Sequence, residues 1–180
     1  GTIVDSTLVH GATSPGRRKK NGETVDPDVA YTSRKGKAKA GMKVHLSMDQ
    51  GSGLIEQITL TPITVHDHHV FEELIPEKTK IVYADKAYDS KEHRLYLKKQ
   101  NQRNGILRKA CRHRPLTMKE QQRNRTLSRI RSAIESKVND LKRWCHLHRL
   151  RYFTMKRNVI QVVCAAIGVN LKRSVLLVQR

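Results

Sequence analysis

Two short apolar segments, far apart in the sequence, each end in an aspartate, and this pattern constrains the fold more than any other. Thr2-Ile-Val leads to Asp5, and Ile81-Val-Tyr-Ala leads to Asp85. β-Branched residues favour strands, so both segments are predicted to be core strands. If these strands are neighbours, the two carboxylates repel each other unless a cation lies between them. Oxygen ligands suit a hard divalent cation, so the pattern favours Mg²⁺ or Mn²⁺.

The rest of the chain predicts one mixed sheet with helices on both faces, which is an α/β fold. Met42 to Met48 alternates in hydrophobicity, and a turn at residues 49–53 joins it to a second strand over Leu54–Leu60. The other predicted elements are a short helix from the N-cap Asp67 to Leu74, a helix from the cap Ser90 to about Gln100, a strand at Gly105–Leu107, helical sequence from Thr117 to about Trp144 with a break, and a buried apolar helix from Asn158 to about Leu177.

Charge indicates the class of partner. The 180 residues contain 36 Lys plus Arg against 16 Asp plus Glu, a formal net charge of +20. A domain this basic favours a polyanion, so nucleic acid is the leading partner; a ribosomal-type protein or a merely soluble basic chain are the alternatives. Residues 10–40 are predicted to be a long, mobile, basic loop. The candidate phosphate contacts outside the helices are Arg17, Arg18, Lys19, Lys20, Arg34, Lys35, Lys37, Lys43, Arg112 and Arg114.

The cysteines and the apolar content bear on the compartment. Cys111, Cys145 and Cys164 are odd in number and form no paired spacing, which favours reduced thiols in the cytoplasm. No charge-free apolar stretch of membrane length appears, so no membrane partner is expected. The length suits a single domain spanning residues 1–180. Because the chain begins directly at a strand, we expect it to be a fragment.

A third acid lies on the predicted helix before Trp144. At 100° per residue, Arg131, Glu135 and Lys142 share one narrow face beside an apolar stripe. A surface ion pair four residues apart would also explain Arg131 and Glu135. The residues alone leave both interpretations open.

Several segments together resemble the DDE transposases of bacterial insertion sequences, families four and five. The helix motif of that family is Tyr, two residues, Arg, three residues, Glu, six residues, Lys. This chain matches its spacing with Arg131, Glu135 and Lys142, although Ser128 stands at the Tyr position. The other similar segments are Thr2-Ile-Val-Asp-Ser-Thr7, Gly41-Met-Lys-Val-His45, Ser52-Gly-Leu-Ile55, Ala84-Asp-Lys-Ala-Tyr-Asp89 and Asn170-Leu-Lys-Arg173.

The resemblance implies a ribonuclease H-like fold whose catalytic acids map onto Asp5, Asp85 and Glu135. It implies two Mg²⁺ or Mn²⁺ ions, hydrolysis at transposon ends and attack of the freed 3′-hydroxyl on target DNA. Lys142, Arg131 and Ser128 then become candidate DNA contacts. The family also implies a helical end-binding domain that precedes this chain, a bacterial, nucleoid-associated location and, by analogy, a homodimer on DNA.

Two rival interpretations stay open. The same acids would serve a ribonuclease H-like nuclease that does not join strands, and a transposase-derived DNA-binding protein could be catalytically silent. Residues 66–69, His-Asp-His-His, look like a metal cluster, but Asp67 is sufficiently explained as a helix cap. Trp144 could stack on a base, although its place at the end of an apolar stripe predicts a core residue.

Overall fold

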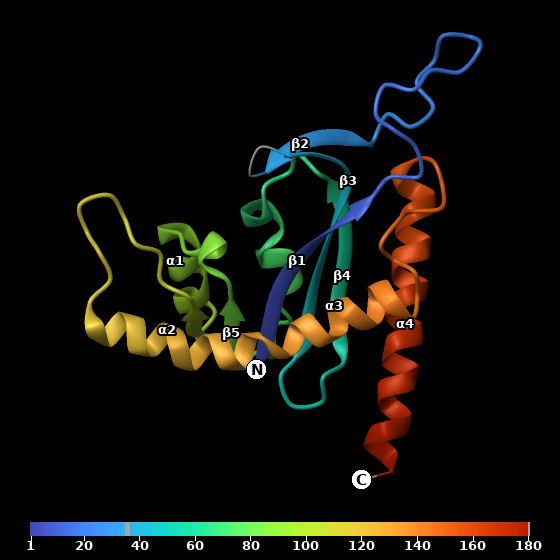
Figure 1. Ribbon diagram of the computed structural model, residues 1–180. Coiled ribbons are helices and arrows are strands. Elements are labelled where there is room, and N and C mark those ends of the chain that lie inside the picture. The colour runs from blue at the N-terminus through green and yellow to red at the C-terminus, as the bar shows by residue number, and fades with distance from the viewer. Residues whose placement is uncertain (35–36, 180) are drawn as a thin grey trace. The chain divides into compact units, whose positions relative to one another are not determined.

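The computed structural model describes residues 1–34 and 37–179 and contains a six-stranded sheet with four α-helices (Figure 1). The strand order is β2-β3-β1-β5-β6, with β4 paired to β3 off this path. The predicted mixed α/β sheet is therefore confirmed. The strands are β1 (Thr2–His10), β2 (Ala30–Arg34), β3 (Lys37–Asp49), β4 (Ile55–Pro62), β5 (Ile81–Ala84) and β6 (Arg103–Ile106). The helices are α1 (Lys91–Lys99), α2 (Met118–Arg131), α3 (Ala133–Arg143) and α4 (Met155–Val178), and the 3₁₀ turns are η1 (Asp67–Val70), η2 (Glu72–Leu74) and η3 (Lys86–Tyr88).

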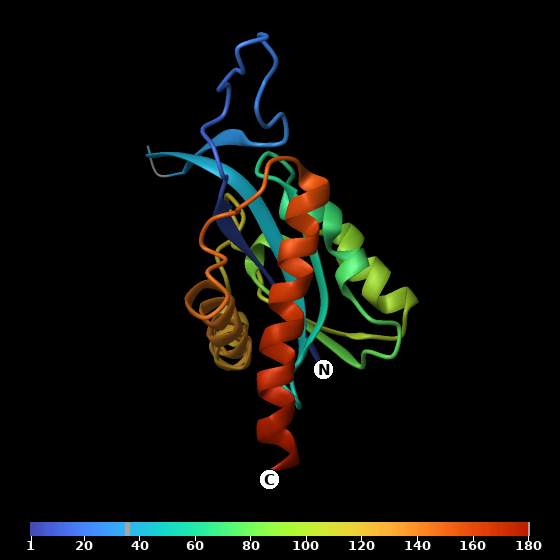
Figure 2. The same ribbon diagram turned by 90° about the vertical axis from the view of Figure 1, so that its right-hand side faces the viewer.

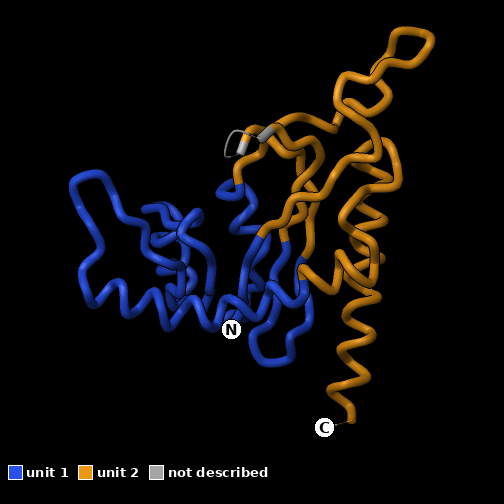
Figure 3. Tube along the Cα trace, in the orientation of Figure 1, with its two compact units in different colours: residues 1–5, 46–57, 67–137 blue, residues 6–45, 58–66, 138–180 orange. Residues whose placement is uncertain are grey.

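The chain divides into two compact units, coloured separately in Figure 3. Unit 1 contains residues 1–5, 46–57 and 67–137, and unit 2 contains residues 6–45, 58–66 and 138–180. Strands β1, β3 and β4 and helix α3 contribute residues to both.

Unit 1 is built on parallel strands. Thr2, Ile3 and Val4 of β1 pair with Val82, Tyr83 and Ala84 of β5, and β5 pairs in parallel with β6. Val4, Val82 and Ala84 are fully buried, as expected for parallel strands covered on both faces. Their core continues into the segments that follow each strand, with the buried side chains of Val70, Phe71, Leu74, Ile75, Tyr88, Leu97 and Ile106.

Caps define the helix starts of unit 1. The Ser90 hydroxyl accepts from the His93 N–H at 3.0 Å and begins α1, as predicted. Thr117 and Glu120 form a capping box at the start of α2, and the predicted break falls at Ser132, between α2 and α3. The helix expected from Asp67 to Leu74 is wrong in detail, because the chain forms the two 3₁₀ turns η1 and η2 there.

The prediction of a loop over residues 10–40, in unit 2, is wrong for part of that stretch. Residues 30–34 form β2, which pairs antiparallel with residues 37–41 of β3. Earlier, Arg18 forms a bridge with Thr24, so this stretch folds back on itself as well. A basic strand carries a weak hydrophobic signal, which is why the sequence alone predicted a loop. The alternating side chains Met42 and Val44 are fully buried, in agreement with the prediction for β3.

The last helix also differs from expectation. α4 is one uninterrupted helix (Figure 2), but it is not buried on most sides. Its buried residues are Asn158, Val162, Ala165, Ala166 and Val169, whereas Ile160, Ile167 and Leu171 are more than half exposed. A helix with apolar residues on most sides does not reveal which side its neighbours cover. By length and hydropathy α4 could also cross a membrane, a property that core helices of globular proteins share.

Candidate active site

The strand register brings the first two acids together. Val4 pairs with Ala84 in the parallel ladder, and Asp5 and Asp85 are the next residues of their two chains. Neighbouring strands lie about 4.8 Å apart, and paired positions of parallel strands project their side chains to the same face. Both aspartates are half-buried. Asp85 leaves β5 directly into η3, where its carbonyl accepts from the Tyr88 N–H at 3.0 Å. The register therefore gives the two aspartates adjacent backbone positions. The expectation that both acids end a strand holds for Asp85 only, because β1 continues past Asp5 to His10.

Arg131 links the third acid to the first. It is the last residue of α2, and Glu135 lies in the first turn of α3. One guanidinium nitrogen of Arg131 donates to Asp5 Oδ2 at 3.1 Å, and the other donates to Glu135 Oε1 at 3.2 Å. Arg131 is only 17% exposed, and its buried Nε has no partner among the described residues. The two carboxylates thus lie within reach of one cation, a role that the guanidinium fills here.

The charges of this group are unbalanced. Two carboxylates, of Asp5 and Glu135, contact one guanidinium, and with Asp85 on the strand next to Asp5 the four residues have a net charge of −2. Carboxylate oxygens are the ligands that hard divalent cations prefer. Glu135 is 58% exposed, so its side chain can change rotamer at little cost. Within residues 1–34 and 37–179, however, no three His, Cys, Asp or Glu side chains are already placed to hold a metal. The donor set fits a divalent ion once Arg131 releases a carboxylate.

Comparison with known families agrees with this geometry. Residues 1–171 match the family described as "Transposase DDE domain". The chain belongs to this family. Members of it generally use divalent metal ions, in keeping with the acids on the adjacent chains of β1 and β5.

Two individual proteins illustrate the relationship. The chain is 34% identical to the transposase for insertion sequence element IS1106 of Neisseria meningitidis serogroup B, over 96% of this chain and 64% of that protein. It therefore spans just under two thirds of this relative. The fold also resembles a cryo-EM structure of piggyBac transposase in a synaptic complex with hairpin DNA. That match has a TM-score of 0.56 at 11% identity and covers 94% of this chain and 45% of the other. This likeness supports the expected ribonuclease H-like fold.

Lys142 lies on α3 two turns after Glu135, at a position that belongs to unit 2. Burial lowers the pKa of the Lys142 ammonium, and the positive charge of Lys39 lowers it further. Two cations that repel each other favour an anion between them. Ser128, at the Tyr position of the DDE transposase motif, is exposed on α2 of unit 1.

The remaining predicted DNA contacts fall into different surroundings. Arg17, Arg18, Lys19 and Lys20 are exposed in unit 2, where Lys19 pairs with Glu23 at 3.0 Å. Lys43 of the same unit instead donates to the Val65 carbonyl at 2.6 Å. Arg34 is the last residue of β2 and Lys37 is the first residue of β3, whereas Lys35 lies outside the described residues. Arg112 and Arg114 are exposed in unit 1.

Two features were missed or misjudged from the sequence. Trp144, predicted to be a core residue, is 56% exposed, with Lys172 over its ring at 4.3 Å and Arg143 at 5.1 Å. In unit 1, the carboxylate of Asp89 forms ion pairs with both Arg94 and Arg108. Asp89 belongs to a segment that resembles the family, but nothing in the spacing of the two arginines indicated that they would meet it.

Proposed function

We propose that this domain cuts and joins DNA, with Asp5, Asp85 and Glu135 as its catalytic acids. The observation that carries the proposal is the parallel register of β1 and β5, which gives Asp5, inside β1, and Asp85, just after β5, adjacent backbone positions. Membership of the transposase DDE domain family and the relation to an insertion sequence transposase support it.

The carboxylates would hold two divalent ions, Mg²⁺ or Mn²⁺. Asp5 would serve both ions, while Asp85 and Glu135 would each complete one coordination shell. Two ions at such a site neutralise the scissile phosphate and activate an oxygen nucleophile. Arg131 would then exchange its contact with Asp5 or Glu135 for a phosphate oxygen, which also offers its unpartnered Nε an acceptor. No side chain needs to form a covalent bond to DNA.

DNA is the proposed partner because of charge as well as family. The net charge of +20 favours a polyanion, and a phosphate beside Lys142 would relieve the repulsion from Lys39. We infer that transposon ends and target DNA are the substrates, in the bacterial cytoplasm, and that two copies act together on paired ends. The exposed residues Arg17, Arg18, Lys20, Arg112 and Ser128 are proposed as secondary DNA contacts.

The test is a cleavage and joining assay on labelled duplex DNA with Mg²⁺ or Mn²⁺. We expect nicking and strand joining by the parent protein, and loss of both in Asp85→Ala and Glu135→Gln. Glu73→Gln is the matched control, because Glu73 is an exposed acid of the same unit outside the site.

The outcomes separate the rival functions. Nicking without joining would favour a ribonuclease H-like nuclease. DNA binding without Mn²⁺ binding or cleavage would favour a silent DNA-binding protein and contradict the proposal. Cleavage that persists in both site variants would remove Asp85 and Glu135 from the chemistry and contradict the proposal.

A further inference from the structure

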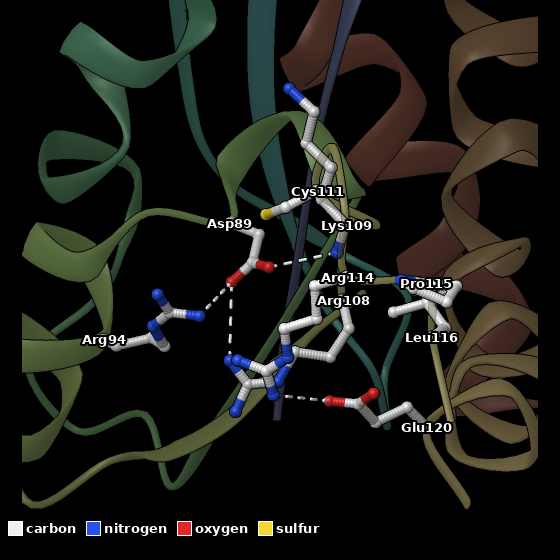
Figure 4. A pocket seen from close by; sticks show the side chains of 9 residues that line it. All are labelled: Asp89, Arg94, Arg108, Lys109, Cys111, Arg114, Pro115, Leu116 and Glu120. Atoms are coloured by element: carbon white, nitrogen blue, oxygen red, sulfur yellow. Dashed lines mark hydrogen bonds and ion pairs between the residues drawn. The ribbon is translucent and has the colours of Figure 1, made fainter. Parts of the chain in front are cut away.

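A second charged site lies in unit 1, in a pocket of about 450 Å³ (Figure 4). Its lining comes from the segment after η3, from α1, from the loop that leads to α2, and from the first turn of α2. The lining residues are Asp89, Arg94, Arg108, Lys109, Cys111, Arg114, Pro115, Leu116 and Glu120.

A buried carboxylate organises the inner end of the pocket. The Asp89 side chain is 7% exposed, and its Oδ1 receives an Arg94 N–H at 3.0 Å and lies 3.6 Å from Arg108 Nη1. Its Oδ2 accepts from the Lys109 backbone N–H at 3.0 Å. Both guanidiniums therefore converge on one point. Each has five N–H donors, so a single contact with Asp89 leaves donors for a second anion.

The outer wall of the pocket is held by hydrogen bonds. The Arg108 backbone exchanges hydrogen bonds with the Asn124 side chain at 2.9 and 3.0 Å. Cys111 and Arg114 exchange two backbone hydrogen bonds at 3.2 and 3.0 Å. Glu120 is used in the capping box with Thr117 and lies 3.7 Å from Arg114. A wall fixed in this way loses little conformational entropy when a ligand binds.

The charges of the lining select the ligand. The lining contains four cationic residues, Arg94, Arg108, Lys109 and Arg114, and two carboxylates, so its net charge is +2. The Lys109 ammonium points away from Asp89 (Figure 4), so the three guanidiniums are the cationic groups nearest the carboxylates. Both carboxylates already have partners within the lining. A phosphate monoester carries −1.5 to −2 charges at neutral pH, whereas a phosphodiester within a strand carries one. Arginine forks match phosphate oxygens, and Pro115 with Leu116 offers an apolar surface to a sugar.

We propose that this pocket binds the 5′-terminal phosphate of a cut DNA strand. The inference rests on the proposed function, because hydrolysis adds a water oxygen to phosphorus and breaks the bond from phosphorus to O3′. The reaction leaves a 3′-hydroxyl on one strand and a 5′-phosphate on the other. Asp89 follows Asp85 by four residues, so the two lie no more than roughly 14 Å apart along an extended chain. The pocket would retain the 5′ side of the cut beside the catalytic acids.

The test compares two short fluorescent duplexes that differ only in a 5′-phosphate or a 5′-hydroxyl. Binding is measured by anisotropy in EDTA, so that divalent metal at the catalytic acids cannot contribute. We expect the phosphorylated duplex to bind about tenfold more tightly, the size of one or two charge-assisted hydrogen bonds. Arg108→Ala and Arg114→Gln should remove most of this preference. Arg114 is largely exposed, so its substitution should leave the fold intact. Arg125→Ala, an exposed arginine of α2 outside the pocket, should keep it.

Three results would overturn the proposal. The first is equal affinity of the parent for the two duplexes. The second is a preference for the 5′-phosphorylated duplex that is the same in Arg108→Ala as in Arg125→Ala. The third is an equal gain in affinity when the duplex carries a 3′-phosphate in place of the 5′-phosphate. The first would mean that the pocket takes no terminal phosphate, the second that the preference reflects net charge alone, and the third that the 5′ assignment is wrong. Failure of the proposed function is distinct, since it would show as lost metal-dependent cleavage with the phosphate preference in EDTA unchanged.

Discussion

Two groups of acids and arginines in unit 1 use the same residue types in opposite arrangements. In the first, Arg131 lies between Asp5 and Glu135, and with Asp85 the net charge is −2. In the second, Asp89 lies between Arg94 and Arg108, and the pocket carries +2. In each group the central residue holds the outer ones in place, and the excess of outer charges determines the ligand. The first group is suited to cations and the second to anions.

The largest expected effect separates one aspartate of each group, Asp85 of the first and Asp89 of the second. Asp85→Ala should lower metal-dependent cleavage at least about a hundredfold, since it removes a proposed metal ligand, while thermal stability changes little. Asp89→Ala should instead lower the free energy of unfolding by about 2 kcal/mol, because two arginines lose their shared partner. Cleavage rates and urea unfolding measured on both variants would test this. If Asp89→Ala unfolds like the parent, Asp89 does not organise its arginines.

Arg131 offers a test of the cation-binding group. Removing a positive charge from between two carboxylates should strengthen Mn²⁺ binding at least about fivefold, which corresponds to the roughly 1 kcal/mol that Coulomb's law gives for unit charges 4 Å apart in water. Calorimetric titration of Arg131→Gln with Mn²⁺ measures this directly. Arg129→Gln serves as the control, because Arg129 is exposed on the same helix. Weaker binding in Arg131→Gln would mean that the arginine positions the carboxylates and does not compete with the metal.

Lys142 lies in unit 2, outside both groups, and provides a reference for simple phosphate binding. Lys142→Ala should weaken DNA binding uniformly across sequences and reduce the magnitude of the salt slope of log K by about 1. The measurement is duplex affinity over a series of salt concentrations, with Lys119→Ala of unit 1 as the exposed control. A loss confined to one sequence would indicate base contact instead.

The smallest expected effect concerns the helix that carries Arg94. The buried His93 ring contacts the carbonyl oxygens of Tyr88 and His68, and burial lowers the pKa of His93 below its usual 6.5. The unfolded chain then takes up this proton first as pH falls. The contribution of His93 to stability should therefore be complete above about pH 6.5 and be lost as pH falls through the folded pKa.

Thermal unfolding at several pH values would measure this decrease. The difference between parent and His93→Gln isolates the contribution of His93, and His146→Gln, an exposed histidine of unit 2, is the control. A decrease that persists in His93→Gln would assign the effect to other groups.

Sequence reasoning succeeded where a signal was local. β-Branched residues before Asp5 and Asp85 predicted two core strands, and Thr117 predicted the start of α2. The end of the first strand was placed too early, since β1 runs on to His10. It failed where burial depends on distant neighbours. Trp144 continues an apolar stripe yet is exposed, and α4 is apolar on sides that nothing in the described structure covers.

The pocket around Asp89 was missed for a related reason. Asp89, Arg94 and Arg108 come from three separate segments, and their meeting depends on how β6 returns beside β5. Each arginine alone looks like one of many solvated cations in a basic chain. By contrast, Arg131 and Glu135 are four residues apart on consecutive helices, and this spacing allowed their pairing to be predicted from the sequence.

The pairing of Val4 with Ala84 makes residue count as important as residue type near Asp5. Side chains alternate between the two faces of a strand, so a shift of one position would turn the aspartate to the opposite face while leaving it in the sequence. Deleting a single residue from β1 should therefore be as harmful as replacing the acid. The exposed stretch around residues 17–20 should accept insertions more readily. Insertions into this domain should therefore be made around residues 17–20, and the number of residues between Gly1 and Asp5 should stay unchanged.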